Sequence, residues 1–298
     1  MTKLEERLFA NVDYAFLRSV SGSPAEIQAV LDRISDMLCD DIDPIQLLAH
    51  NRVVYEETAL QYAQNTEHEH IPDALIAFMN KLRNNDMVLD IGCGTGRDAV
   101  FMAISDRTLR KCFMGRMKDG KAAHERFGIP RKSFFALGID ASPGMVRSAT
   151  AFAEAHGLTR RGGEAPRAEF LCEIADMHFL RTVETVEGLF DGVWSSAALF
   201  MHTPQQCIAP ALEGVAHVLR RGGVFGVSYF NSPIGVSYNN LRYSRTGEIK
   251  YFSRPQSAQI VLAAESAGLC LIEESLSDLE MAGTLKKDFF ISQLFRKK

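Results

Sequence analysis

The stretch Val88-Leu89-Asp90-Ile91-Gly92-Cys93-Gly94-Thr95-Gly96-Arg97 joins an apolar run to three alternating glycines. The apolar residues predict a buried β-strand, and the residues from Asp98 to Ala103 predict a helix directly after the glycines. Glycine is needed where the backbone turns sharply from strand to helix and a ligand must press against the main chain. A dinucleotide-binding fold would place its third glycine at position 97, which is Arg97 here. The spacing therefore disfavours a pyrophosphate ligand.

Short apolar runs alternate with amphipathic helices from residue 72 onward, which is typical of a parallel sheet with crossover helices. Seven runs are predicted as strands: Met87–Ile91, Phe134–Asp140, Ala168–Cys172, Phe190–Ser195, Val224–Phe230, Leu269–Glu273 and Asp288–Phe295. A helix between the fourth and fifth runs is expected to begin at Thr203-Pro204, to kink near Pro210 and to stop at Gly222-Gly223. No helix separates the last two runs, which suggests an antiparallel strand at the edge of the sheet.

The region before the sheet, residues 1–70, is predicted to be helical, and its acidic residues, Glu56 and Glu57 among them, are expected on a solvated face. The predicted fold class is α/β, with a doubly wound, seven-stranded, mostly parallel sheet in residues 71–298 and an added N-terminal helical segment. Two features interrupt that domain: a basic insertion at 104–133 and a long loop at 231–254 after the fifth strand.

Composition excludes several classes of protein. The 298 residues are 46% apolar and 23% charged, as in soluble globular domains. No apolar run approaches the roughly 20 residues that cross a bilayer, and the N-terminal residues lack a leader pattern, so a cytoplasmic location without membrane attachment is expected. The six cysteines are scattered singly, so neither disulfides nor a metal site is expected. A net charge of −4 provides no general attraction to nucleic acid.

Five motifs together resemble the class I S-adenosylmethionine (SAM) dependent methyltransferases, over about residues 52–297. They are the V-L-D-x-G-C-G-x-G-R pattern from Val88 to Arg97, the G-x-D-x-S-x-x-M element from Gly138 to Met145, Ala175-Asp176-Met177, the F-D-x-V-x-S strand from Phe190 to Ser195, and a V-L-R-x-G-G turn from Val218 to Gly223 with Arg221 in place of proline. A helix that carries Tyr55 and Tyr62 also resembles one that lies over SAM in many members that act on small molecules. The resemblance implies SAM as the cofactor.

The resemblance also implies which residues hold the cofactor. Asp140 is expected to accept hydrogen bonds from the ribose hydroxyls, and Asp176 and Met177 are expected around the adenine. Asp140 lies farther than the usual spacing of about 20 residues from the glycines, because the basic insertion intervenes; Asp106 and Asp119 fit that spacing better, but neither ends an apolar strand. The implied cofactor-binding residues are Tyr62, Asp90, Gly92, Cys93, Gly94, Gly96, Asp140, Ala141, Met145, Ala175, Asp176, Met177 and Ser195.

The sequence restricts the class of methyl acceptor mainly through the motifs that it lacks. Ser195-Ser196-Ala197-Ala198 follows the fourth strand where an enzyme of base amino groups would have an Asn/Asp-Pro-Pro-aromatic tetrad, and neither paired glutamates nor clustered carboxylates stand in the candidate loops. The residues in these loops are mainly aromatic and apolar with a few polar groups, which suits a small molecule methylated on O, N or C. The expected acceptor-binding residues are Tyr55, Phe200, Tyr229, Tyr238 and Arg242.

His202 is the candidate catalytic residue, because it stands in the loop after the fourth strand and an imidazole titrates near neutral pH. The alternative is that it shapes this loop by hydrogen-bonding a backbone carbonyl. Three other functions stay open: an RNA-directed methyltransferase that docks through the basic stretches 104–133 and 160–167, an NAD-dependent oxidoreductase, and a binding module that holds SAM without chemistry.

Overall fold

The computed structural model describes residues 44–66, 71–113, 130–159, 167–172, 180, 184–232, 237–243, 248–277 and 290–298. Several predictions fall outside this part of the chain: the helices before residue 44, the adenine element Ala175-Asp176-Met177, and most of the two basic stretches. For Tyr238 and Arg242 the structure describes the backbone only.

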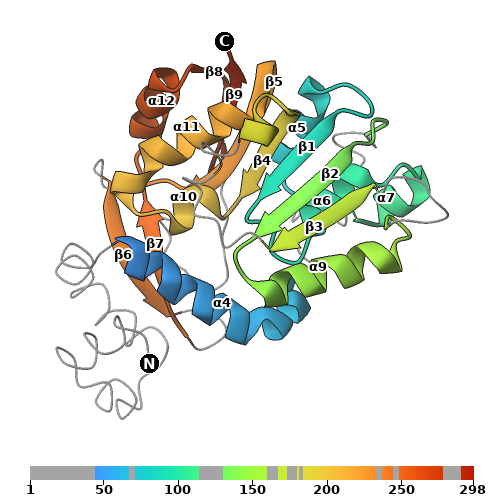
Figure 1. The fold of residues 1–298 in the computed structure, drawn as a ribbon, viewed down its shortest axis with the longest axis horizontal. Coiled ribbons are helices and arrows are strands. Elements are labelled where there is room, and N and C mark those ends of the chain that lie inside the picture. The colour runs from blue at the N-terminus through green and yellow to red at the C-terminus, as the bar shows by residue number, and fades with distance from the viewer. Residues whose placement is uncertain are drawn as a thin grey trace.

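A seven-stranded sheet forms the centre of the protein, in the order β3-β2-β1-β4-β5-β9-β8 (Figure 1). Its strands are β1 (Met87–Ile91), β2 (Phe135–Asp140), β3 (Ala168–Cys172), β4 (Phe190–Ser196), β5 (Leu219–Phe230), β8 (Leu269–Ser277) and β9 (Phe290–Lys297). The first five are parallel, and Val88 of β1 lies opposite both Ala136 of β2 and Gly192 of β4. The strand order reverses between β1 and β4, which is where ligands bind in such sheets, beyond the carboxyl ends of the strands. The predicted fold class is confirmed.

The end of the sheet differs from the sequence expectation in one respect. β9 is antiparallel to both β5 and β8, so the antiparallel strand lies one position inside the edge and β8 forms the edge. The reason is burial: Leu294 and Phe295 of β9 are 3% and 0% exposed, whereas Leu276 of β8 is 66% exposed. β9 is buried on both faces over most of its length, which suits a strand inside the sheet, whereas an edge strand keeps one side open to solvent.

The helix before β5 is shorter than expected. α11 (Ile208–Val218) ends at Val218, and β5 begins at Leu219, before the glycine pair that was expected to stop the helix. The pairing of β4 with β5 shifts register between Phe190 and Gly192, next to these glycines. Pro210 is the third residue of α11, where a backbone N–H has no intrahelical acceptor, so the proline removes no hydrogen bond and the reason for expecting a kink disappears.

A separate two-stranded sheet occupies part of the segment that was expected to be a loop. β6 (Tyr238–Tyr243) pairs antiparallel with β7 (Ile249–Arg254), and Leu241 lies opposite Tyr251. β7 packs against α10 (Leu199–His202) and α4 (Pro44–Thr66). The hairpin therefore reaches the carboxyl side of the main sheet, where the ligands are expected.

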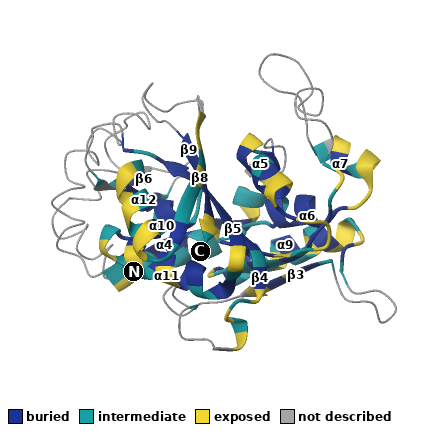
Figure 2. Cartoon of the chain, turned by 90° about the horizontal axis from the view of Figure 1, so that it is seen from above, coloured by how far each residue is buried: buried dark blue, intermediate teal, exposed yellow. Residues whose placement is uncertain are grey.

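Helices cover both faces of the main sheet, and alternate residues of each strand separate the two layers of core. Val88, Trp194 and Val224 pack with α5 (Asp73–Lys81), whereas Leu89 and Phe225 pack with α11. α6 (Arg97–Ala103) and α9 (Pro143–Ala155) lie on the α5 face, and α12 (Ser257–Ser266) lies on the α11 face. Figure 2 shows the strands buried between these layers.

Arg110 in α7 (Arg107–Phe113) belongs to the basic insertion that was considered as a docking site for RNA, and it is buried. Its side chain is 1% exposed, and burial lowers its pKa to about 10. Its guanidinium donates hydrogen bonds to the carbonyl oxygens of Phe101, Met102, Ile104, Pro130 and Lys132. Arg110 therefore satisfies the last carbonyls of α6 and the segment that leads into β2. It is a structural residue and is not available for docking to RNA.

α4 is the described part of the predicted N-terminal helical segment. It runs across the carboxyl ends of the parallel strands and contacts α9 and β7 (Figure 1). Because α9 follows β2 and β7 belongs to the separate hairpin, α4 joins two parts of the molecule that are distant in sequence.

Candidate active site

The glycine turn after β1 adopts a backbone that requires glycine. Gly92, Gly94 and Gly96 have φ values of 68°, 54° and 81°. A Cβ atom at Gly92 would collide with the Cβ of Ala198, whereas the nearest atom to a Cβ at Gly94 would be a ring carbon of Tyr62, at 3.9 Å. Close packing against Ala198, just before α10, therefore requires glycine at position 92. At Gly94 there is free space on the side that faces α4.

Asp140, the last residue of β2, lies beside this turn. Its Oδ2 accepts a hydrogen bond from the N–H of Gly94 at 2.9 Å, and its Oδ1 accepts one from the N–H of Ser142 at 2.9 Å. Burial raises the pKa of Asp140, and the backbone N–H groups of Ser142 and Gly94 oppose that rise. The register of β1 and β2 brings the two predicted cofactor elements together, although 46 residues separate Gly94 from Asp140.

Asp90 lies at the base of the turn and is 2% exposed. Its Oδ2 has no hydrogen-bond partner, and burial together with repulsion from Asp98 raises its pKa well above the usual range. Burial also raises the pKa of the adjacent Cys93 thiol. A buried carboxylate oxygen without a donor is costly unless a ligand supplies one. The cradle at Gly94 and the unpaired oxygen of Asp90 therefore fit a ligand that carries hydrogen-bond donors.

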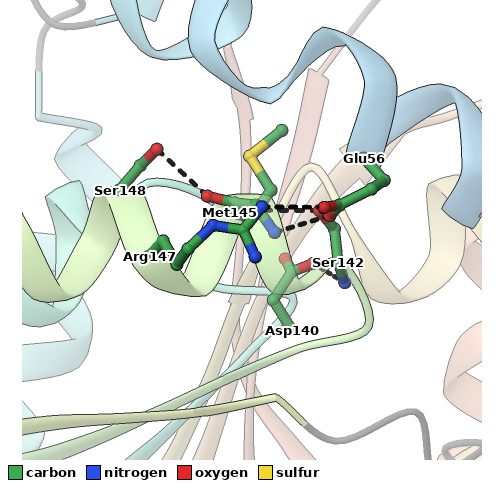
Figure 3. A network of polar contacts seen from close by, with 7 residues as sticks. Glu56, Asp140, Ser142, Met145, Arg147 and Ser148 are labelled. Atoms are coloured by element: carbon green, nitrogen blue, oxygen red, sulfur yellow. Dashed lines mark hydrogen bonds and ion pairs between the residues drawn. The ribbon is translucent and has the colours of Figure 1, made fainter.

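Glu56 of α4 reaches the N-terminus of α9 (Figure 3). Its Oε2 accepts hydrogen bonds from the hydroxyl of Ser142 at 2.7 Å and from the N–H of Gly144 at 2.5 Å, and its Oε1 pairs with Arg147 at 2.9 Å. These contacts lower the pKa of Glu56, the Ser142 hydrogen bond most and the Gly144 N–H next. The expected solvated face holds for Glu56 only in part: its side chain is 36% exposed, but its carboxylate is bound at the start of α9, because helix N-termini favour carboxylates.

Two further residues of α4 bind the backbone of β7. The amide of Asn51 accepts from the N–H of Tyr251 at 2.9 Å and donates to its carbonyl oxygen at 2.8 Å, as a neighbouring strand would. Nε2 of His50 lies 2.9 Å from the carbonyl oxygen of Ile249. The sequence contains no local signal for these contacts, because about 200 residues separate the partners.

His202, at the end of α10, is held on two sides. Its Nε2 lies 3.0 Å from the hydroxyl of Tyr55, and its Nδ1 lies 3.2 Å from Nδ2 of Asn51 and 3.3 Å from the carbonyl oxygen of Tyr251. Protonated on Nδ1, the ring donates to Tyr251 and accepts from Tyr55; protonated on Nε2, it donates to Tyr55 and accepts from Asn51. Burial lowers the pKa of His202 to about 4, so the imidazole is neutral at pH 7.

Lys250 of β7 was not predicted for the site. Its Nζ lies 3.9 Å from the ring centroid of Tyr55 and 5.7 Å from that of Tyr62, and the residue is 3% exposed. Burial lowers its pKa to about 8, and Glu248 opposes this shift. The available signal was a single lysine inside the apolar run Ile249-Lys250-Tyr251-Phe252.

The remaining candidates occupy different surroundings. The Ser195 hydroxyl donates to the carbonyl oxygen of Ile91 at 2.8 Å and accepts from the N–H of Leu199, so it ties β4 to β1 and α10. Phe200 and Tyr229 are 0% exposed and meet edge to face in the core, and the Tyr229 hydroxyl donates to Gln293. Their contact with an acceptor stays a prediction. Met145 is buried at the start of α9, and Ala141 is exposed.

The described residues provide neither a metal centre nor a membrane-spanning helix. They contain no group of three or more His, Cys, Asp or Glu side chains that could hold a metal ion. No helix within the same ranges is long and apolar enough to cross a membrane.

No protein-family model and no curated protein matches the sequence, but solved structures match the fold. The Burkholderia thailandensis 1,6-didemethyltoxoflavin-N1-methyltransferase, solved with 1,6-didemethyltoxoflavin and S-adenosylhomocysteine, has a TM-score of 0.57 and 16% identity, covering 86% of this chain and 91% of its own. A SAM-dependent methyltransferase from Methanosarcina mazei has a TM-score of 0.55 and 18% identity, covering 77% and 99%. The 4+2 cyclase SpnF has a TM-score of 0.53 and 16% identity, covering 83% and 96%. Identities this low establish the fold alone.

Proposed function

We propose that this chain, which has the fold of the class I SAM-dependent methyltransferases, binds SAM and transfers its methyl group to a small-molecule acceptor. The observation that carries the proposal is the glycine turn beside Asp140. Backbone N–H groups hold both oxygens of that carboxylate, and each oxygen keeps a lone pair for a ribose hydroxyl. SAM is an electrophilic methyl donor, and the reaction needs little from the protein except position and the exclusion of water.

Each residue around the turn binds a different part of the cofactor in this proposal. Asp140 takes the ribose hydroxyls, and the unpaired Oδ2 of Asp90 accepts from a donor on the cofactor. Gly94 lets the cofactor approach the main chain, and Tyr62 covers it from α4. Asp176 and Met177 hold the adenine in this proposal. An NAD-dependent reaction is disfavoured, because Arg97 stands where the third glycine would be and pairs with Asp98 at 2.8 Å.

The acceptor binds next to Tyr55 and His202, beneath α4. His202 orients the Tyr55 hydroxyl through their hydrogen bond. An acceptor that must lose a proton passes it to this hydroxyl as the hydroxyl gives its own proton to Nε2 of His202. With a pKa of about 4, the imidazole is neutral at neutral pH and can receive this proton, but it is a weak base. Such a base suits an acceptor that is itself acidic.

Titration calorimetry with SAM, S-adenosylhomocysteine and NAD tests the cofactor. We expect the first two to bind and NAD not to bind. Asp140→Ala should weaken SAM binding by about 1–3 kcal/mol, whereas Glu169→Ala, an exposed carboxylate on β3, should leave it unchanged. Tighter binding of NAD than of SAM overturns the proposal. Mass spectrometry of a metabolite library incubated with methyl-labelled SAM then tests transfer; unlabelled products throughout would leave a SAM-binding module without chemistry.

A further inference from the structure

Lys250 is a buried cation without a matching anion. It is 3% exposed, and no hydrogen bond or ion pair joins its ammonium to another residue that the structure describes. Lysine is almost never buried so completely unless it is paired, because an ammonium loses its hydration on burial. The faces of Tyr55 and Tyr62 attract the cation but accept none of its three N–H groups in the way an oxygen would.

The groups that face Lys250 come from three elements, and they leave its charge uncompensated. Tyr55 and Tyr62 project from α4, and burial raises the pKa of Tyr55 well above its usual value, so its hydroxyl stays neutral. His202 of α10 is neutral above pH 4. Among the described residues, Glu248, just before β7, is the carboxylate that acts on Lys250, and no hydrogen bond joins the two. Tyr55, Tyr62 and His202 are partly exposed, and the ammonium lies 3.9 Å from the Tyr55 ring centroid, so a small molecule that contacts these side chains comes close to it.

We propose that Lys250, with Tyr55 and His202, binds an acidic oxygen of the methyl acceptor, which is therefore a small organic acid present as a carboxylate, phenolate or enolate. The inference rests on the function proposed above and specifies its substrate class. The anion supplies the partner that the buried ammonium lacks, and the neutral Tyr55–His202 pair offers a hydrogen-bond donor beside it. An acceptor that arrives ionised also makes few demands on a base as weak as His202.

The pKa of Lys250 gives the site a characteristic pH dependence. The ammonium is charged below about pH 8 and loses its charge above it. The affinity for an anion should therefore be constant between pH 6 and 7 and fall about tenfold per pH unit above pH 8. His202 and Tyr55 titrate far from this range, so they do not add a second step. An arginine at position 250 stays charged and should abolish the fall.

Calorimetric titration of the protein saturated with S-adenosylhomocysteine tests the inference. The probes are benzoate, 4-nitrophenolate and acetate, each paired with a neutral partner: benzamide, 4-nitroanisole and acetamide. The pH profile uses benzoate and acetate, which stay ionised from pH 6 upward, and 4-nitrophenolate is compared above pH 8 only. We expect at least one anion to bind about tenfold or more tightly than its partner. Lys250→Met should weaken that anion about 30-fold or more and leave S-adenosylhomocysteine binding unchanged. Lys111→Met, an exposed lysine on α7, serves as the matched control.

The outcomes separate this inference from the proposed function. Equal affinity for every anion and its neutral partner, an unchanged anion affinity in Lys250→Met, or no fall above pH 8 in the wild-type protein would each overturn the assignment. The pH dependence of anion affinity is measured on the wild-type protein, so it tests the assignment of Lys250 even if Lys250→Met fails to fold. If S-adenosylhomocysteine fails to bind, the proposed function is wrong, and the same titrations with cofactor-free protein still decide whether Lys250 holds an anion.

Discussion

The proposed cofactor side and the proposed acceptor side of this site are built differently. Backbone groups form the cofactor side: the turn at Gly92–Gly96 and the N–H groups that hold Asp140 follow directly from two neighbouring strands. Side chains form the acceptor side, where Asn51, Tyr55, His202 and Lys250 meet from α4, α10 and β7. The cofactor side therefore depends on backbone conformation, and the acceptor side depends on how α4 packs against α10 and β7.

Gly92→Ala tests the backbone side and should have the largest effect. Its φ of 68° disfavours a side chain, and the new methyl group would collide with Ala198. We expect a loss of about 2–5 kcal/mol in the free energy of unfolding, measured by urea denaturation. Gly222→Ala is the matched control, because its φ is 76° but an added Cβ meets nothing within 4 Å. A control that costs as much as Gly92→Ala would show that backbone strain acts alone and that packing against Ala198 contributes nothing.

Asn51→Ala tests the side-chain side. The substitution removes both hydrogen bonds that Asn51 makes to the backbone of Tyr251, in a place where Asn51 is 4% exposed. We expect the free energy of unfolding to fall by about 1–3 kcal/mol, and acceptor turnover to fall with it. Affinity for S-adenosylhomocysteine, measured by calorimetry, should stay within about threefold of wild type. An equal fall in acceptor turnover and in affinity for S-adenosylhomocysteine would contradict the separation of the two sides.

The division also explains what the sequence could predict. The strand, the glycine turn and Asp140 were predictable because their signals are local and the parallel register aligns them. The β6–β7 hairpin was missed because Tyr238–Tyr243 mixes polar and apolar residues without clear alternation. Arg110 was counted among the basic residues that could dock RNA, because charge alone does not reveal that carbonyls of α6 and of the segment before β2 surround it. Asn51 and Lys250 depend on packing between segments about 200 residues apart, which one sequence does not encode in any local pattern.

The hydrogen bond between Tyr55 and His202 tests the acceptor side at a single contact. A double-mutant cycle with Tyr55→Phe and His202→Gln should give a coupling of about 0.5–1.5 kcal/mol in the free energy of unfolding. Turnover should fall in both single variants with the affinity for SAM unchanged. If His202→Gln lowers turnover less than about tenfold, His202 is a positioning residue and is not a base. A coupling near zero would mean that the hydrogen bond is not formed in solution.

Glu56 joins the two sides, and its effect should be the smallest, because solvent screens a side chain that is 36% exposed. Its pKa is lowered in the folded protein, chiefly by the Ser142 hydroxyl, so the unfolded chain binds the proton more readily than the folded one. The stabilisation from Glu56 is therefore fully present above the unfolded pKa of about 4.3 and disappears as the pH falls through the folded value. We expect Glu56→Gln to lower the melting temperature slightly at pH 7, and the gap to wild type to close as the solution is acidified below pH 4. Glu57→Gln, its exposed neighbour on α4, should show no gap at either pH. A gap for Glu56→Gln that persists in acid would mean that shape complementarity, and not the charge at the start of α9, holds α4 against the cofactor side.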